Sequence, residues 1–210
     1  LYAYIGIGQI VNMMENERLL FERLLTHARE KEDTDLVSKL EAISPYPDPQ
    51  CPEQSLAKSA KFLRGKLSDL AGEALMRHTP RDDMISVINL DRLLSPHLTL
   101  TDLGHSIAGG DIAVMRPPYY FGKEFMAVDL PNDLGCSFKV PIFFFTGAHD
   151  WQTLRILSDQ WFNQIDAPCK ELLHFEESSH VVINEEPGKL LVALVNKVLP
   201  LAGDIAAQSI

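Results

Sequence analysis

Cysteine is scarce in this chain, and its placement argues against two kinds of site. The three cysteines among 210 residues, Cys51, Cys136 and Cys169, lie far apart and form no Cys-x-x-Cys pair. Neither a disulfide framework nor a cysteine-based zinc site is therefore expected. No cluster of histidines, cysteines and carboxylates has the spacing of metal ligands, so we expect no metal and no cofactor. This cysteine usage fits a reducing compartment, and we predict a cytoplasmic location.

Basic residues are too few to favour a nucleic-acid partner. The chain has 19 Lys and Arg residues against 29 Asp and Glu residues, which gives a formal net charge of -10. A surface field of that sign repels a phosphate backbone. No apolar stretch approaches the roughly 20 residues that a membrane-spanning helix needs. We therefore expect neither nucleic acid nor a membrane as partner.

The chain opens with a strand pattern and not with methionine. Residues 1–8 read Leu-Tyr-Ala-Tyr-Ile-Gly-Ile-Gly, an apolar run that ends in glycine, which is typical of a strand buried on both faces. A parallel strand without neighbours is unstable, so its partners must lie later in the chain or in a segment that precedes Leu1. We expect such an N-terminal segment to be missing from these residues.

Helical periodicity follows, from Asn16 to about His78. Apolar stripes recur at three- and four-residue spacing, and a proline-rich segment at residues 44–49 separates the second stripe from the third. Thr34 is the expected N-cap of the second helix. The stripes are Leu20, Leu24, Leu25 and Ala28; Leu36, Val37, Leu40 and Ile43; and Leu56, Ala60, Leu63, Leu67, Leu70 and Ala71. They predict a helical block with a leucine-rich core.

Strands and helices alternate in the last third of the chain. An apolar run at residues 140–145 ends in Thr-Gly, a helical stripe covers 153–165, and a short strand covers 171–175. Pro187 opens a final helix. The residues of this helix that we expect to face inward are Leu190, Leu191, Leu194, Val195 and Val198. The order strand, helix, strand, helix predicts an α/β fold in which helices cover a parallel sheet.

Two residues stand where such a sheet gathers its catalytic groups. Asp150 follows the first of these strands and His180 follows the second, thirty residues later. One helix and one strand fill that interval, so the two side chains can meet at adjacent carboxyl ends of the sheet. An aspartate bonded to a histidine fixes its tautomer and stabilises the imidazolium. The alternative is a solvated turn aspartate and a surface histidine; His149 and His174 are weaker candidates.

The segments around these residues resemble a known family. Residues 141–153, Pro-Ile-Phe-Phe-Phe-Thr-Gly-Ala-His-Asp-Trp-Gln-Thr, together with 175–180 and 184–187, are similar to the last third of α/β hydrolases of the proline iminopeptidase-like group. Residues 4–13 resemble that group's sixth strand and the entry to its helical cap. The resemblance implies that Asp150 orients His180, which acts as general base and then as general acid. Leu154 stands where the family usually has proline.

The resemblance also implies a division of the chain. The fold would be the C-terminal part of an α/β-hydrolase parallel sheet with an inserted helical cap: residues 1–13 form a core strand and the cap entry, 14–135 the cap, and 136–210 the C-terminal half of the core. The resemblance implies a small-molecule or short-peptide substrate, and in an aminopeptidase of this group acidic cap residues would hold the substrate ammonium. Glu15 and Glu17 are available for that role, and the alternative is that they are ordinary charges in the first turn of a helix.

The nucleophile that this family needs does not stand in its usual motif. A Gly-x-Ser-x-Gly elbow is absent, and the nearest segment is Gly-His-Ser-Ile-Ala-Gly at residues 104–109, which contains Ser106. Only 44 residues separate Ser106 from Asp150. Two crossovers would have to fit there, and a single one occupies about 30 residues. Ser106 is therefore a weak candidate, and the resemblance places the serine before Leu1.

Two classes of function remain open at this stage. The first is a portion of a serine hydrolase that works through an acyl-enzyme, with an aminopeptidase of the proline iminopeptidase type as the leading activity and an esterase or epoxide hydrolase as alternatives on the same fold. The second is a non-catalytic binding protein or inactive fragment that keeps the helical cap without turnover. The first predicts a serine elbow in frame upstream or on a companion chain; the second predicts none.

Overall fold

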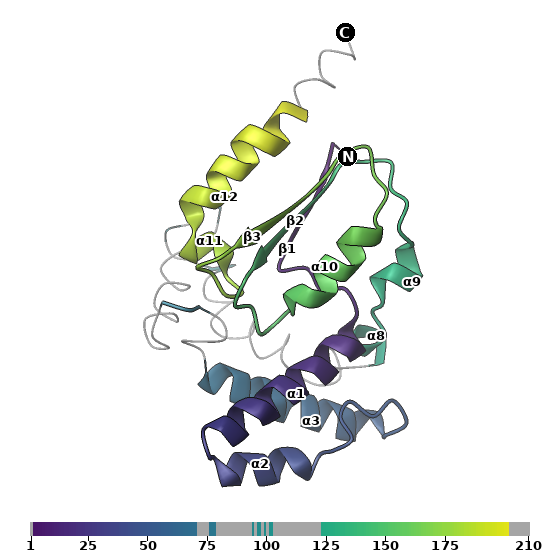
Figure 1. The fold of residues 1–210 in the computed structure, drawn as a ribbon, viewed down its shortest axis with the longest axis vertical. Helices are drawn as coiled ribbons and strands as arrows, with labels where there is room; N and C mark the ends of the chain where they lie inside the picture. The colour runs from purple at the N-terminus through teal and green to yellow at the C-terminus, as the bar shows by residue number, and fades with distance from the viewer. Residues whose placement is uncertain are drawn as a thin grey trace. The chain divides into compact units, whose positions relative to one another are not determined.

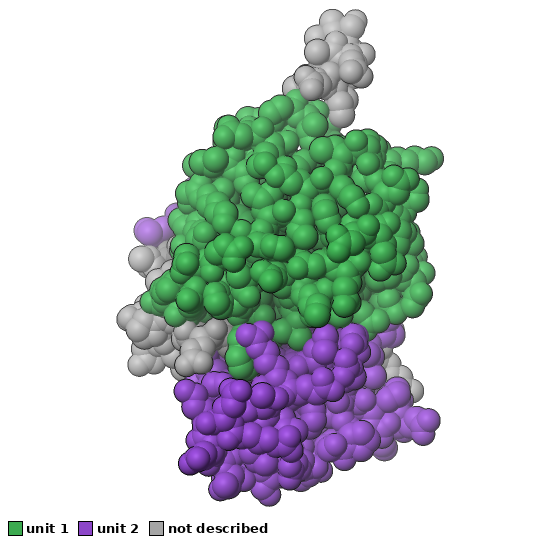
Figure 2. Space-filling model, viewed as in Figure 1, with its two compact units in different colours: residues 1–12, 73–78, 129–210 green, residues 13–72, 79–128 purple. Residues whose placement is uncertain are grey.

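The computed structural model describes residues 2–70, 76–78, 94, 96–97, 99, 101–102 and 123–201. The chain forms two compact units, coloured separately in Figure 2. The sheet unit comprises residues 1–12, 73–78 and 129–210, and the helical unit comprises 13–72 and 79–128. The long insertion in the middle of the chain thus has a core of its own, apart from residues 73–78, which belong to the sheet unit.

The sheet unit is built on three parallel strands in the order β1 (Tyr4–Ile7), β2 (Ile142–Gly147) and β3 (Lys170–Phe175). Ile5 lies opposite Phe143, and Phe143 lies opposite Glu171. The helices of this unit are α9 (Leu130–Leu134), α10 (Arg155–Gln164), α11 (Val182–Glu185), α12 (Pro187–Ala193) and the π-helical η2 (Leu194–Val198). The alternation confirms the predicted α/β fold with a parallel sheet.

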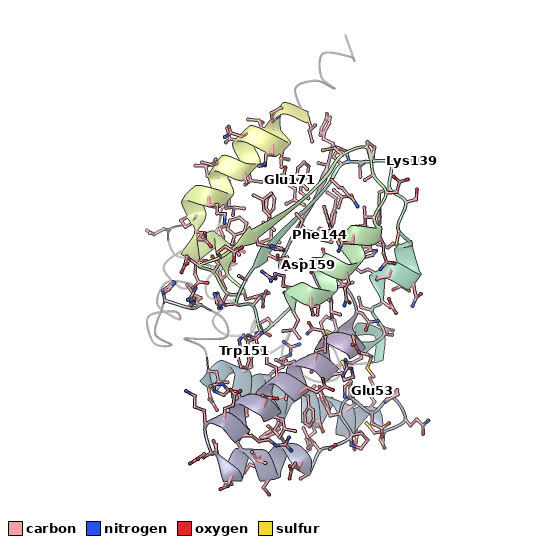
Figure 3. The ribbon with its side chains drawn as sticks, viewed as in Figure 1. Glu53, Lys139, Phe144, Trp151, Asp159 and Glu171 are labelled. Atoms are coloured by element: carbon pink, nitrogen blue, oxygen red, sulfur yellow. The ribbon has the colours of Figure 1, made fainter. Side chains whose placement is uncertain are left out.

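Helices cover both faces of this sheet, as Figure 1 shows for α10 on one face and α12 on the other. Successive side chains of a strand point to opposite faces, so the phenylalanines of β2 divide between two cores. Phe143 and Phe145 pack with Phe175 and with the inner face of α12. Phe144, labelled in Figure 3, packs against Trp161 and Phe162 of α10. Burial of β2 on both faces explains its uninterrupted apolar run.

Two expectations about burial in the sheet unit were wrong. β1 is an edge strand in the described part of the chain, and Tyr4 and Ile7 are 38% and 45% exposed, so this strand is not buried on both faces. In the last helix, Leu191 and Val195 point outward, because the inward row runs through Leu190, Ala193, Leu194 and Val198. A helix with 3.6 residues per turn cannot face every residue of such an apolar segment to one side.

The helical unit contains α1 (Met13–Glu30), α2 (Thr34–Glu41), α3 (Glu53–Asp69) and the short α8 (Lys123–Met126). The predicted stripes supply its buried residues, including Leu20, Leu24, Ala28, Leu40, Ala60, Leu63 and Leu67. The cap of α2 differs from the prediction. Asp33 is the N-cap, because its carboxylate accepts the Leu36 N–H at 2.9 Å, and Thr34 is the first helical residue.

A buried polar cluster joins α1, α3 and the proline-rich segment within the helical unit. The Glu17 carboxylate is fully buried, and it accepts hydrogen bonds from the Tyr46 hydroxyl and the Arg64 guanidinium. Burial raises the pKa of the Tyr46 hydroxyl, and the charge of Glu17 raises this pKa further. A buried carboxylate of this kind requires its partners, since an unpaired buried charge is costly.

We expect Tyr46→Phe to weaken the helical unit at neutral pH and to change its response to alkali. The lost hydrogen bond to a charged group costs about 1.5–3 kcal/mol of unfolding free energy. In the wild type, the unfolded chain releases the tyrosine proton near its ordinary pKa of about 10, whereas the folded chain retains it. Stability therefore falls as pH rises above that value, and the variant lacks this contribution.

Urea unfolding followed by circular dichroism between pH 7 and pH 11 measures both effects. The exposed Tyr2 offers a matched control, because Tyr2→Phe should leave the urea midpoint unchanged at every pH. An alkaline loss of stability that is as steep in Tyr46→Phe as in the wild type would contradict the role given to the buried hydroxyl.

None of the helices in the described part of the chain combines the length and the apolar character required to cross a bilayer.

Candidate functional site

Asp150 lies in the turn that follows β2, and its carboxylate is nearly inaccessible, with the residue 2% exposed. Oδ1 accepts the backbone N–H groups of Gln152 and Thr153 at 2.7 and 3.0 Å. The neighbouring Trp151, labelled in Figure 3, is also buried in this turn. Because backbone donors compensate its burial, the carboxylate is held in one orientation before α10 begins.

His180 reaches the same place from the loop after β3. Its Nδ1 lies 2.9 Å from Oδ2 of Asp150. β2 and β3 are adjacent and parallel, so the loops that follow them leave the sheet at the same edge, as the spacing of the two residues predicted. The structure thus brings both sequence-predicted site residues into one hydrogen-bonded pair.

The geometry assigns distinct tasks to the two ring nitrogens of His180. A carboxylate oxygen accepts, so the Nδ1–H group donates to Asp150 and the lone pair of the neutral ring lies on Nε2. The side chain of His180 is 34% exposed, whereas that of Asp150 is 1% exposed. In the described part of the chain, no hydroxyl or thiol is bonded to Nε2. A neutral imidazole accepts a proton through that lone pair.

Thr153 is a third member of the site that sequence reasoning did not identify. Its hydroxyl donates to Oδ2 of Asp150 at 2.8 Å and lies 3.4 Å from Nδ1 of His180. The residue is 7% exposed. The carboxylate of Asp150 closes an Asx turn before α10, and a threonine three positions after a turn aspartate could have indicated this contact. The hydroxyl fixes the carboxylate oxygen that accepts the hydrogen bond from His180.

Gly8 is the fourth member, and it comes from β1. It adopts a φ of +56°, which side chains rarely tolerate, and a Cβ placed there would lie 3.1 Å from Cε1 of His180. The glycine at the end of the opening strand pattern was visible in the sequence, but its contact with His180 was not. All three strands of the sheet therefore contribute a residue to the surroundings of His180.

The structure gives the other two histidines near this region different hydrogen bonds. The carbonyl oxygen of His149 accepts the Ser179 hydroxyl at 3.3 Å. His174 lies within β3, and its Nε2 is 3.0 Å from Asp159 of α10. In the ranges that the structure describes, no group of three or more His, Cys, Asp or Glu side chains has the arrangement of a metal site.

The acidic residues considered as ligands for a substrate ammonium are engaged within the helical unit. Glu17 is buried against Arg64 and Tyr46. Glu15 accepts two hydrogen bonds from Arg18, at 2.8 and 2.6 Å. Hydrogen bonding to Arg18 lowers the pKa of the Glu15 carboxyl. Glu17 is thus a core residue, and not a solvated charge of the first turn. Ser106 lies outside the described residues.

Comparison with known proteins gives structural neighbours of low similarity. No protein-family model matches the chain, and no curated protein matches it. A thermophilic esterase aligns at 13% identity and a TM-score of 0.44, over 70% of this chain and 49% of that structure. The Mycobacterium smegmatis proline iminopeptidase aligns at 16% identity and a TM-score of 0.43, over 99% of this chain and 59% of that structure.

A third solved structure, MGS-M2, is an α/β hydrolase enzyme from a Medee basin deep-sea metagenome library. It aligns at 16% identity and a TM-score of 0.40, over 96% of this chain and 56% of that structure. The chain therefore spans about half to three fifths of the length of these neighbours. Identities and scores in this range do not establish a family.

Proposed function

We propose that this chain is the acid–base portion of a serine hydrolase of the α/β-hydrolase kind, with release of N-terminal proline from short peptides as the leading activity. The observation that carries the proposal is the Asp150–His180 pair, with 2.9 Å between Oδ2 and Nδ1, at the carboxyl end of a parallel sheet. The proline preference rests on the family resemblance of residues 141–153 and 4–13.

In this mechanism His180 moves two protons and Asp150 moves none. Nε2 takes the proton of a serine hydroxyl as that oxygen attacks the substrate carbonyl carbon, and the imidazolium then gives the proton to the leaving amine. A water molecule repeats the sequence on the acyl-enzyme, which releases the acid product. Asp150 stabilises the imidazolium, and Thr153 holds Asp150 in place.

The proposal requires a nucleophile from outside the described residues, and β1 offers a place for it. A strand that paired in parallel with the edge of β1 that is open among the described residues would end beside Gly8, where a Cβ would lie 3.1 Å from the ring of His180. The turn after such a strand would bring its first side chain close to Nε2. We therefore propose an N-terminal segment, supplied upstream or by a companion chain, that carries the serine on a strand-to-helix turn.

Apolar hollows on both sides of β1 support an additional strand at this edge. On the side of α12, Ala3 and Ile5 line a groove together with Val195 and Val198. A second hollow on the other side of the strand includes Tyr4, Phe144 and Trp161. An exposed apolar edge strand offers unpaired backbone N–H and C=O groups to another strand. An added strand with apolar residues on both faces, followed by a helix, would fill the hollows and protect this edge.

A substrate panel tests the proposed activity on the protein paired with its upstream segment. We expect kcat/KM for proline p-nitroanilide to exceed that for other aminoacyl anilides, with little turnover of an epoxide. His180→Ala should abolish turnover. Faster hydrolysis of p-nitrophenyl esters than of any anilide would replace the peptidase with an esterase. Binding of prolyl peptides without turnover, retained in His180→Ala, would identify a binding protein and contradict the proposal.

A further inference from the structure

The loop that carries His180 is held by two consecutive glutamates that follow it in the chain. Glu186, the residue before α12, accepts the Glu177 N–H at 3.1 Å and the Ser178 hydroxyl at 2.7 Å. Glu185, the last residue of α11, accepts the Ser179 N–H at 2.6 Å. Both serines of the loop are fully buried. Three successive residues before His180 are thus bonded to carboxylates.

The second oxygen of Glu185 binds a segment from a distant part of the sequence. Oε1 accepts the backbone N–H of Arg77, and it accepts the N–H of His78 at 3.3 Å. Arg77 adds side-chain bonds to the same loop, at 3.0 Å to Glu177 and 3.3 Å to the carbonyl oxygen of Glu176. One carboxylate therefore bridges residues 77–78 and the peptide that precedes His180.

A carboxylate is required for this bridge, because all the groups that it meets are N–H donors. Glutamate presents two acceptor oxygens, one for each backbone segment. Glutamine at this position has one oxygen and one NH₂ group, so either Ser179 or the 77–78 segment would face a second donor. Alanine would leave both segments without this partner. At position 185, glutamate should therefore bind both backbone segments, glutamine one of them, and alanine neither.

The position of this loop decides whether His180 meets Asp150. The ring of His180 is bonded to Asp150 at 2.9 Å and has a weaker contact with Thr153 at 3.4 Å. On its other side the loop is bonded to the Asp150 turn, where the His149 N–H donates to Ser178 at 3.0 Å. Glu185 holds the same loop through Ser179, the residue next to His180.

We propose that Glu185 is a positioning residue for His180, and that it couples the anchoring of residues 77–78 to the orientation of the imidazole. The effect on turnover rests on the proposed function, but the effect on orientation does not. The simpler reading is that the bonds between the His180 loop and the Asp150 turn suffice, so that Glu185 contributes only to general stability. The two readings differ in what happens to the His180–Asp150 hydrogen bond in a folded Glu185 variant.

Proton NMR of the 210-residue chain tests this directly, through the downfield Nδ1–H signal that His180 should give and that His180→Asn should remove. We expect Glu185→Ala to speed the exchange of this proton with water by about tenfold or more, the factor that corresponds to one lost bond to a charged group. Glu185→Gln should give a smaller increase. Glu171→Gln is the matched control, because Glu171, labelled in Figure 3, binds Lys197 away from the loop.

Hydrogen-exchange mass spectrometry of the same variants adds a second readout. Peptides that cover residues 76–78 and 176–180 should lose protection together in Glu185→Ala. If that variant does not fold, Glu185→Gln still decides, because it keeps one of the two bonds. A wild-type exchange rate for the Nδ1 proton in a folded Glu185→Gln or Glu185→Ala chain would overturn the proposal, as would loss of protection in one segment alone.

Kinetics of the complete enzyme separate this proposal from the proposed function. Glu185→Ala should lower kcat by about 10²-fold with little change in KM, since a displaced catalytic group costs about that much. If the wild type has no turnover at all, the proposed function fails while the NMR result still stands. If the wild type is active and Glu185→Ala has the same kcat, the positioning role of Glu185 is contradicted and the proposed function is not.

Discussion

Asp150→Asn is expected to lower the kcat of the complete enzyme by about 10⁴-fold while leaving the fold intact. Asparagine keeps the oxygen that accepts the Gln152 and Thr153 N–H groups, so the turn can form as before. Its NH₂ group would face Nδ1 of His180 and would donate to it. The imidazole proton then moves to Nε2, and the nitrogen that should accept the serine proton is already protonated.

The chain contains a matched control for this prediction. Asp159 and His174 form a second pair, 3.0 Å apart, on α10 and β3. Asp159→Asn removes a carboxylate from an Asp–His pair without touching the proposed site, and it should leave kcat within a factor of about two of the wild type. Steady-state kinetics on both variants make the comparison. Equal losses in the two variants, or no loss in Asp150→Asn, would contradict the role of the Asp150–His180 pair.

Gly147→Ala is expected to be the most destabilising single substitution in the sheet unit. A Cβ on Gly147 would lie 1.7 Å from the carbonyl oxygen of Ser179, a distance that no side-chain movement can relieve because the obstacle is backbone. The end of β2 and the His180 loop would have to separate. We expect a loss of more than about 3 kcal/mol of unfolding free energy, at the upper end for overpacking.

The same separation should affect the site before it affects the whole fold. The His180 loop is bonded to the Asp150 turn by the His149 N–H, at 3.0 Å to Ser178, and this bond cannot persist if the loop moves away. Any Gly147→Ala chain that folds should therefore have lost the His180–Asp150 hydrogen bond. Gly188→Ala is the control, since a Cβ at Gly188 meets nothing within 4 Å.

Urea unfolding of the two glycine variants gives the comparison. Gly188 lies in the first turn of α12, and alanine there should leave the free energy of unfolding within about 1 kcal/mol of the wild type. A Gly147→Ala chain as stable as Gly188→Ala would mean that the His180 loop does not rest against the end of β2.

Alternation of strands and helices in the last third predicted the parallel sheet, and the spacing of Asp150 and His180 allowed them to meet, whereas their roles came from the family resemblance. One helix and one strand fill the thirty residues between Asp150 and His180, which leaves few arrangements, and parallel neighbours must end at the same edge. Where periodicity alone was used, side chains were misplaced. Leu191 and Val195 were assigned inward because they are apolar, but the helix can bury only one row. The sequence pattern predicts Thr34 as the N-cap of α2, but the carboxylate of the neighbouring Asp33 accepts the Leu36 N–H instead.

Contacts between distant segments could not be predicted from the sequence. Gly8 meets His180 because β1 adds to the sheet next to β2, and Glu185 meets Arg77 across more than a hundred residues. Glu17 looked like a surface charge at the start of a helix, and its burial depends on Tyr46 and Arg64 from two other segments. Neither periodicity nor motif spacing predicts contacts between residues that lie far apart in the sequence. The domain boundaries drawn from the resemblance stay a prediction.

The central proposal is that a serine from outside residues 1–210 works with His180. A fluorophosphonate reacts with an activated serine, so labelling followed by intact-mass spectrometry and peptide mapping locates the nucleophile. We expect no adduct on residues 1–210 and one adduct on the serine of an upstream or companion segment, with labelling lost in His180→Ala. An adduct on Ser106 or another serine of these 210 residues would contradict the claim that the nucleophile comes from outside. Absence of any adduct on the complete protein would contradict the serine hydrolase itself.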